Sequence, residues 1–310
     1  ITHECHQQMF MLPKAVKKFG EDGTKAAKDE VWQLHHRGCF KALAVKELTR
    51  IEKERAVDGL MFVSQKRTGE YKGQLAYNGK PTREWISRED KSSPTAYNES
   101  IFLTCAIDAK EKRDMMSIDV PNAFIQTHMP LPKDGERVVM KARGRLVDWL
   151  IELDPTSYAS KVVYEGKSRV IYLEVLRAIY GMLVASLLWY RKIKSDLESE
   201  GFKFNPYDAC IANRTYLQVQ QTIRLHVDDM LVSSSNPKAN DDFHAWCEKK
   251  YGKLKPVKCT RGKLHEFLGM TLDFGKTPGS CHVMQYEHVR DMIDTLANFE
   301  KCKFTGNSPS

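Results

Sequence analysis

The sequence of 310 residues predicts an α+β fold, and three observations support this. Apolar residues at helical spacing alternate along the chain with short apolar runs typical of strands. Some neighbouring strand-like runs are separated only by turn residues, which indicates antiparallel hairpins. With 42% hydrophobic residues the chain can bury a real core, and its length allows two domains or one domain with a large accessory lobe.

The N-terminal third is expected to form two helices and a hairpin. Gly38 is placed to end the first helix, because glycine readily adopts the left-handed conformation of a helix C-terminus. The turn-prone pair Thr68-Gly69 separates two apolar runs and favours a strand pair. The expected elements are helices over 24–37 and 45–56 and strands over 60–63 and 71–77.

The middle of the chain is expected to start with a helix that Ser93 caps, with Pro94 at its first position. This helix would end near Arg113. It would turn three apolar residues toward the core, namely Ile101, Cys105 and Ile107. A strand over 115–120 follows, and then strand-containing segments over 137–142 and 161–172 around a short helix over 146–153.

The last third is expected to alternate helices and strands. Gly201 closes a long helix, and Asn236-Pro237 opens another that Gly252 ends. The expected elements are the helix 184–200, strands over 210–214 and 221–233, the helix 237–252, a hairpin over 266–274 and 281–285, and a helix from Tyr286.

Carboxylates interrupt two of the apolar runs, at positions about 110 residues apart in the sequence. One is Asp119, and the other is the doublet Asp228-Asp229, which is expected at or near a hairpin turn. Adjacent carboxylates repel one another unless they face cations or water. Oxygen ligands suit Mg²⁺, and a two-metal site performs in-line phosphoryl or nucleotidyl transfer. The sequence therefore predicts a Mg²⁺ site shared by the two segments.

The net charge of +8 favours a polyanionic partner. Basic residues flank the carboxylates in two groups, as a nucleic-acid channel requires. Solvated helix faces and loops are the alternative reading of each group. The first group is Lys46, Arg50, Lys53, Arg55, Lys66 and Arg67, and the second is Lys249, Lys250, Lys253, Lys255, Lys258, Arg261 and Lys263.

Other classes of site are less well supported. The eight Cys residues form no C-x-x-C pair, which favours reduced intracellular thiols. No stretch approaches the roughly 18 apolar residues of a membrane span, so no membrane partner is expected. The N-terminus has neither an initiator Met nor a secretory segment and suggests a piece of a longer protein. A zinc site and a hydrolase triad lack the ligand spacing and the companion groups that they need. The residues considered for these were His3, Cys5, His6, His35, His36 and Cys39 for zinc, and Ser117, His265 and Glu266 for a triad.

Several short motifs occur in a fixed order along the chain. They are Asp119-Val120-x-x-Ala123-Phe124, Leu176-Arg177-x-x-Tyr180-Gly181 with Leu188-Trp189-Tyr190, Val227-Asp228-Asp229-Met230 and Phe267-Leu268-Gly269-Met270. This ordered set resembles the reverse transcriptase domain of copia-type LTR retrotransposons, from about Lys28 to Phe274. The resemblance implies a right-hand polymerase with fingers, a palm and at most a partial thumb. The palm would be an antiparallel sheet backed by the helices near 94–113 and 184–200.

The resemblance also implies a division of the chain. Residues 1–23 would be an N-terminal flank, and 24–114 the fingers lobe with the first palm helix at about 94–113. Residues 115–265 would form the palm, with an excursion into the fingers at about 130–180, and 266–310 the primer-grip hairpin and the start of a thumb or connection.

The same resemblance assigns roles at the predicted site. Asp119 and Asp228 would hold two Mg²⁺ or Mn²⁺ ions, with Asp229 as a further ligand or orienting group near the primer terminus. Phe124 would lie under the sugar and exclude ribonucleotides, although an ordinary core phenylalanine is the alternative. Further contacts to the deoxynucleotide are expected from Val120, Lys72, Arg83 and Lys250, and one of Lys249, Lys250 and Lys253 would protonate pyrophosphate. Surface solvation is the alternative for Lys72 and Arg83.

Two positions depart from the family pattern. Val184 stands where a Gln usually contacts the nucleotide, and His226 stands where a Tyr is usual. The expected protein is a reverse transcriptase acting on a primed RNA or DNA template with dNTPs. It would belong to a polyprotein with ribonuclease H, integrase and protease, located in a cytoplasmic virus-like particle or in the nucleus. A catalytically inactive nucleic-acid-binding relic and a two-metal phosphodiesterase are the alternatives.

Overall fold

The computed structural model describes residues 9–296 except 67, 85, 88–91, 131–134, 254, 287–288, 291 and 294–295. The chain divides into two compact units, each built from segments that are distant in sequence. The first unit combines 95–121 with the chain from 197 onward, and the second unit combines 6–94 with 122–196. The helix α6 (Ala185–Ser199) contains the point at which the chain passes from the second unit to the first.

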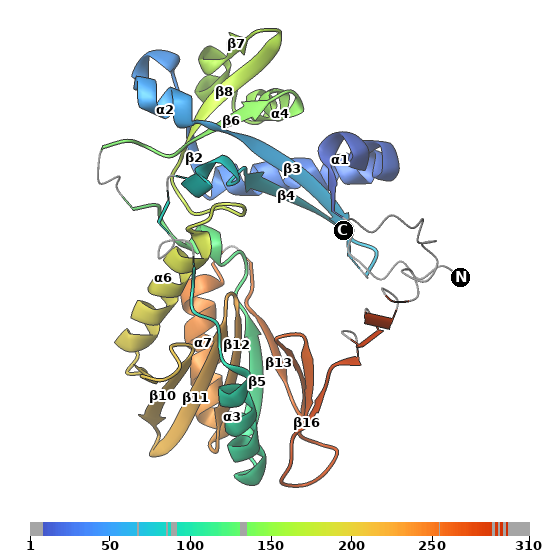
Figure 1. The fold of residues 1–310 in the computed structure, drawn as a ribbon, viewed down its shortest axis with the longest axis vertical. Coiled ribbons are helices and arrows are strands. Elements are labelled where there is room, and N and C mark those ends of the chain that lie inside the picture. Colours follow the sequence, from blue (N-terminus) through green and yellow to red (C-terminus); the bar gives the residue numbers. More distant parts are fainter. Residues whose placement is uncertain are drawn as a thin grey trace, which may run out of the picture. The chain divides into compact units, whose positions relative to one another are not determined.

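The first unit is built on a six-stranded sheet in which every neighbouring pair is antiparallel (Figure 1). The strand order is β13-β5-β12-β11-β10-β9, so β5 lies between strands from much later in the chain. The strands are β5 (Asp114–Asp119), β9 (Lys203–Phe204), β10 (Ile211–Tyr216), β11 (Val219–His226), β12 (Asp229–Ser234) and β13 (Lys258–Arg261).

Helices α3 (Asn98–Lys110) and α7 (Pro237–Tyr251) cover opposite faces of this sheet. Side chains alternate between the two faces along a strand. Arg224 and Ser233 point to the face of α3, where both bond to Asp108. Gln221 points to the other face, where its amide donates to Asn240 on α7 at 3.0 Å. The expectation that a helix near 94–113 backs this sheet is therefore confirmed.

Charge is buried between α3 and the sheet. The guanidinium of Arg224 and the carboxylate of Asp108 are both fully buried and form an ion pair, and Arg224 Nε donates to Thr104 Oγ1 at 2.7 Å. Apolar side chains of α3, β5 and β12, including Ile101 and Leu231, form a buried cluster on the same elements. A buried pair of this kind strongly penalises loss of one partner, because the other charge is then left in the core.

A three-stranded antiparallel sheet completes the described part of the first unit. Its strands are β14 (Leu264–Phe267), β15 (Met270–Asp273) and β16 (His282–Met284). Phe267 and Met270 pair across a two-residue turn of Leu268 and Gly269, which both have positive φ. The segment 266–274 is thus itself a hairpin, to which β16 adds a third strand. The expected helix from Tyr286 and the end of the expected thumb segment lie largely outside the described residues.

The second unit contains a seven-stranded sheet with helices α1 and α4 packed on it (Figure 1). The strand order is β1-β3-β6-β8-β2, with β4 on β3 and β7 on β8, and the β3–β6 pair is parallel. The strands are β1 (Met9–Met11), β2 (Phe40–Leu43), β3 (Val57–Gln65), β4 (Tyr71–Tyr77), β6 (Val139–Arg143), β7 (Val163–Glu165) and β8 (Ser168–Val175). The helices are α1 (Leu12–His36), α2 (Arg50–Arg55), α4 (Arg145–Leu153) and α5 (Pro155–Tyr158), with 3₁₀ turns η1 (Val45–Glu47), η2 (Pro81–Glu84), η4 (Phe124–Gln126) and η5 (Ala159–Lys161).

Three helix predictions were wrong in their boundaries, namely those for α2, for α3 and for the start of α1. The helix expected from Ser93-Pro94 begins only at Asn98, because the backbone N–H of Tyr97 donates to the Asp208 carboxylate at 3.0 Å and holds the preceding residues extended. Ile107, expected in the core, is 38% exposed, and its neighbour Asp108 is buried instead. The helix expected over 45–56 is split into η1 and α2.

The split has a local cause. Thr49 caps α2, with its hydroxyl accepting from the N–H of Glu52 and its own N–H donating to the Glu52 carboxylate. Such a capping box starts a new helix at this point. The expected helix over 24–37 is real but begins at Leu12, with a break at Gly20, and Gly38 with φ of +61° follows its end as expected. In the described part of the chain, no helix is long and apolar enough to cross a membrane.

Candidate active site

The acidic doublet lies at the tip of the β11–β12 hairpin. His226 and Asp229 are paired across the two strands, and Val227 and Asp228 form the turn between them. Val227 has φ of +54°, a conformation that costs energy for a β-branched residue. The prediction of a turn at the doublet is confirmed, and the strained backbone marks this turn as a candidate functional site.

Strand β5 brings Asp119 beside the same turn. Asp119 is the direct cross-strand partner of Asp229, so the two side chains lie on the same face of the sheet. The backbone N–H of Val120 donates to the carbonyl of Asp228 at 3.0 Å, which fixes the turn against the end of β5. The structure thus gathers all three predicted carboxylates at one end of one sheet, although the first is far from the doublet in sequence.

The carboxylates influence one another electrostatically. Partial desolvation, together with the negative charges of Asp228 and Asp119, raises the pKa of Asp229 to about 6, while Lys258 acts in the opposite direction. Because Asp229 as a whole remains more than a third exposed, water screens part of this effect. A cation placed among these three groups would relieve their repulsion.

Lys258 is the residue of this site that the sequence did not single out. It lies opposite Asp119 on β13, and its Nζ is 3.2 Å from Asp119 Oδ2. Its side chain is 71% exposed, so the ion pair is well solvated. The sequence showed Lys258 only as one of a group of basic residues. Its position depends on the pairing of β13 with β5, for which no local signal exists.

The donor set suits a hard cation, but it is not a closed cage. Mg²⁺ binds carboxylate oxygens and commonly keeps several water ligands. No group of three or more His, Cys, Asp or Glu side chains in the described ranges is already arranged to hold a metal ion. The three carboxylates therefore fit Mg²⁺ by their chemistry and common location, while Lys258 is the cation seen beside Asp119.

His226 packs beside the carboxylates. Its ring contacts Phe267 edge to face, with 6.4 Å between the ring centroids. Burial lowers the pKa of His226, although the charge of Asp228 opposes this, and Nδ1 is buried without a hydrogen-bond partner among the described residues. The hairpin that resembles a primer grip is thereby in contact with the strand that leads into the doublet.

Ser117 and His265 join the same hairpin to β5. Ser117 Oγ and His265 Nδ1 are 2.5 Å apart, and His265 Nε2 lies 3.0 Å from the carbonyl of Gly262. The carbonyl can only accept, so Nε2 carries the proton and Ser117 donates to Nδ1. A triad would need a carboxylate where the carbonyl lies, so the pair lacks the third member of a triad.

Predicted nucleotide-binding residues of the second unit gather around one tyrosine. The Phe124 ring lies 5.0 Å from the Tyr180 ring, and Lys72 Nζ lies 5.9 Å from the same ring. Tyr180 is itself fixed, since its carbonyl accepts from the N–H of Tyr77 at 2.7 Å. The next residue, Gly181, has φ of +83°, and a Cβ there would lie 2.1 Å from the Tyr77 carbonyl. Glycine is therefore required at position 181, because a larger residue would collide with the backbone of Tyr77.

The remaining predicted residues have less distinctive surroundings. Arg83 is exposed on η2, and Val120 has a fully buried side chain, so only its backbone can serve the site. Lys250 lies in the last turn of α7 with its Nζ 5.2 Å from the Trp246 ring. The residues Arg67, His3, Cys5 and His6 lie outside the described residues.

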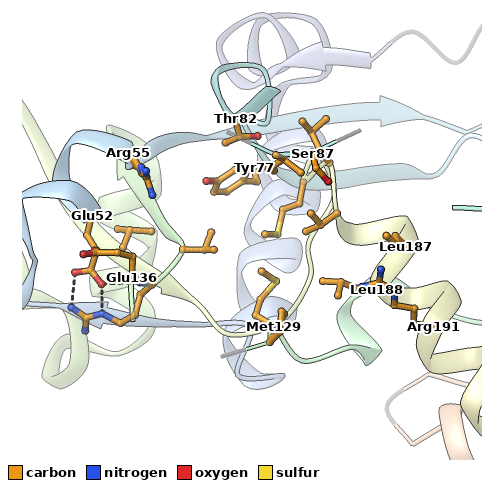
Figure 2. A pocket seen from close by; sticks show the side chains of 18 residues that line it. Glu52, Arg55, Tyr77, Thr82, Ser87, Met129, Glu136, Leu187, Leu188 and Arg191 are labelled. Carbon is orange, nitrogen blue, oxygen red and sulfur yellow. Dashed lines mark hydrogen bonds and ion pairs between the residues drawn. The ribbon is translucent and has the colours of Figure 1, made fainter. Parts of the chain in front are cut away.

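The second unit also contains a cavity of about 510 Å³ (Figure 2). Residues from Met182 to Leu188 supply much of its apolar wall, and Glu52, at one end in Figure 2, forms an ion pair with Arg137. Val184 belongs to this wall. The residue that replaces the usual Gln therefore lines the cavity with a side chain that can form no hydrogen bond.

Residues 158–307 match the family of proteins described as Reverse transcriptase (RNA-dependent DNA polymerase). The doublet and the Tyr180-Gly181 motif lie within the match, while Asp119 and Phe124 precede it. No protein of curated function matches the sequence.

Two solved structures align with most of the chain, both with TM-scores below 0.5. A foamy viral protease–reverse transcriptase in complex with double-stranded DNA has 14% identity and a TM-score of 0.44, over 92% of this chain and 38% of that one. The telomerase of Candida albicans, in complex with a fragment of telomeric RNA, has 8% identity and a TM-score of 0.39. That alignment covers 89% of this chain and 55% of the telomerase chain. The chain thus spans well under two thirds of either protein.

The segment 158–307, just under half of the chain, therefore has the sequence pattern of a family of RNA-directed DNA polymerases. The matched segment is similar to the copia-type reverse transcriptase family. The resemblance drawn from its motifs is thereby confirmed.

Proposed function

We propose that this chain extends a primer on an RNA or DNA template by adding deoxynucleotides, with Asp119, Asp228 and Asp229 as its catalytic residues. The observation that carries the proposal is the direct pairing of Asp119 with Asp229, next to the strained turn that holds Asp228. Neighbouring carboxylates attract cations that reduce their repulsion, and nucleotidyl transfer requires cations at the reacting phosphate.

Asp119 and Asp228 would hold two Mg²⁺ or Mn²⁺ ions, with Asp229 as a further ligand or orienting group. Bound there, such ions would make the primer 3′-hydroxyl more acidic and would stabilise the charge on the leaving pyrophosphate. The chain itself keeps the three carboxylates together through the β5–β12 pairing and the Val120–Asp228 hydrogen bond. Lys258 partly neutralises Asp119 and would have to leave it when a stronger cation binds.

Phe124, Val120, Lys72, Arg83 and Lys250 would contact the incoming deoxynucleotide. The contacts of Phe124 and Lys72 with Tyr180 support a shared role for these two residues within the second unit. A bulky ring at Phe124 would select against a ribose 2′-hydroxyl, and a Lys ammonium suits a triphosphate as a point charge.

The first unit would serve as the palm and the second as the fingers, with the β14–β15 hairpin as the primer grip. The net charge of +8 supports a nucleic-acid partner. We further propose that the chain is one part of a retrotransposon polyprotein that also supplies protease, integrase and ribonuclease H, and that it acts in a virus-like particle or in the nucleus.

Primer extension on poly(rA)/oligo(dT) with dTTP and Mg²⁺ tests the proposal. Lengthening of the primer supports the polymerase, and shortening of a strand would support a two-metal phosphodiesterase instead. Template binding without either change would favour a second candidate, an inactive relic. Two observations favour that candidate, namely Val184 in place of the usual Gln and the unpaired Nδ1 of His226 in the described structure.

A further inference from the structure

Strand β14 contacts both of the strands that lead into the candidate catalytic carboxylates. Its residue His265 is 2% exposed, and His265 Nδ1 lies 2.5 Å from the hydroxyl oxygen of Ser117 on β5. Two residues further along β14, the ring of Phe267 packs edge to face against the ring of His226 on β11. Residues two apart in a strand point to the same side, so one face of β14 makes both contacts.

The two contacts have the same relation to the carboxylates. Ser117 is two residues before Asp119, and His226 is two residues before Asp228. Ser117 and Asp119 therefore lie on the same face of β5, which is the face that β14 contacts. The turn of the β14–β15 hairpin directly follows Phe267, just as the turn that holds the acidic doublet directly follows His226.

The contact between His265 and Ser117 is more directional than the apolar packing around it. Apolar side chains of the hairpin join a cluster with α3, β5 and β12, but hydrophobic burial is non-directional. A hydrogen bond is lost when its two atoms move apart or out of line. The carbonyl of Gly262 holds the second ring nitrogen of His265 at 3.0 Å, so the imidazole is fixed at both ends. Burial lowers the pKa of His265, which keeps the ring neutral and Nδ1 able to accept.

We propose that His265 is a positioning residue, which sets the β14–β15 hairpin at a fixed distance from Asp119 through its hydrogen bond with Ser117. This inference rests on the proposed function, in which the hairpin holds the primer. Reacting atoms must lie within about 3–3.5 Å of one another, and a misplacement of about 1 Å can slow a reaction roughly a hundredfold. Loss of the hydrogen bond would therefore slow nucleotide addition. It would leave template affinity nearly intact, because phosphate contacts supply most of that affinity.

Two pairs of variants separate this role from a merely structural one. Ser117→Ala removes the hydroxyl donor, and Ser117→Thr keeps it. His265→Gln can still donate to the Gly262 carbonyl but has no acceptor at the place of Nδ1, whereas His265→Asn puts an amide oxygen near that place. Tyr216→Phe is the control for a lost hydroxyl. Tyr216 donates to Asp242 at 3.2 Å, at the other end of the same sheet.

The test is primer extension by the full chain, with the affinity for primed template measured by fluorescence anisotropy. In Ser117→Ala and His265→Gln, kcat should fall roughly tenfold to a hundredfold while the Kd for primed template stays close to that of the wild type. Ser117→Thr and His265→Asn should recover most of this loss, and Tyr216→Phe should behave as wild type. The double variant Ser117→Ala/His265→Gln should be no slower than the slower single variant, because both changes remove the same hydrogen bond.

A second readout needs no turnover. With 2-aminopurine as the base at the primer 3′ end, binding should change its fluorescence less in Ser117→Ala than in Ser117→Thr at equal occupancy. A wild type that extends no primer would refute the proposed function, and the fluorescence comparison would then decide the inference. If the wild type does extend primers, equal kcat in Ser117→Ala and Ser117→Thr would overturn the inference alone. Equal fluorescence changes in the two variants would also overturn it.

Discussion

Replacing Asp229 by Asn should stabilise the first unit at neutral pH, because it removes a charge from a repulsive cluster. The pKa of Asp229 is raised from 3.8 to about 6 in the folded protein. A raised carboxyl pKa means that folding disfavours the ionised form. The stability that the protonated Asp229 carboxyl allows is therefore fully present below its unfolded pKa. It is lost as the pH rises through the folded pKa of about 6.

The magnitude follows from the shift. At about 1.4 kcal/mol per pKa unit, the full shift corresponds to about 3 kcal/mol. Asp229 is more than a third exposed, and screening by water reduces this figure to about 1 kcal/mol. Urea unfolding of wild type and Asp229→Asn, both in EDTA, should show this gain for the variant at pH 7.5. The gain should shrink toward zero near pH 4.

Asp242→Asn is the matched control. A hydrogen bond from Lys238 lowers the pKa of Asp242, so folding favours the ionised form of this carboxyl. Neutralising Asp242 should therefore not stabilise the protein at pH 7.5. An Asp229→Asn variant that is no more stable than wild type at pH 7.5, or whose gain is the same at both pH values, would refute the argument from charge repulsion.

Three further substitutions test other parts of the structure. Phe124→Ala should allow ribonucleotide incorporation in a primer-extension assay, and unchanged sugar selectivity would exclude its role as a gate. Asp108→Asn should lower the free energy of unfolding by on the order of 3–5 kcal/mol, because it leaves Arg224 buried and unpaired. The solvated ion pair of Arg261 and Asp241 is the comparison, and it should contribute at most about 1 kcal/mol to the free energy of unfolding in the same urea titration. Equal losses of stability on breaking the two ion pairs would contradict this reasoning. Lys258→Ala should strengthen Mn²⁺ binding several-fold in an electron paramagnetic resonance titration, since Lys258 competes for Asp119; unchanged or weaker binding would show that no such competition exists.

Elements with local signals could be predicted from the sequence. Helix α7 starts after Asn236, whose side chain accepts from the N–H of Lys238, and it ends at Gly252 as expected. The β11–β12 hairpin was also correctly predicted, with the doublet at its turn. In both cases the residues that determine the structure lie within or next to the element.

Features that depend on distant segments were not predictable. The start of α3 was misplaced because Asp208, from another part of the chain, takes the N–H of Tyr97. Asp108 was not expected in the core, since its partner Arg224 comes from β11. At the candidate site, the carboxylates could be named from their motifs. Lys258 could not, because the register of β13 on β5 has no signature in either strand.

The central claim is that the carboxylates at the end of the β5–β12 pair perform nucleotidyl transfer. The most direct measurement compares wild type and Asp228→Asn in primer extension, with template affinity determined for both by fluorescence anisotropy. The account predicts that the variant binds primed template nearly as well as wild type and adds no nucleotides. Extension by Asp228→Asn at a rate near that of the wild type would contradict the claim.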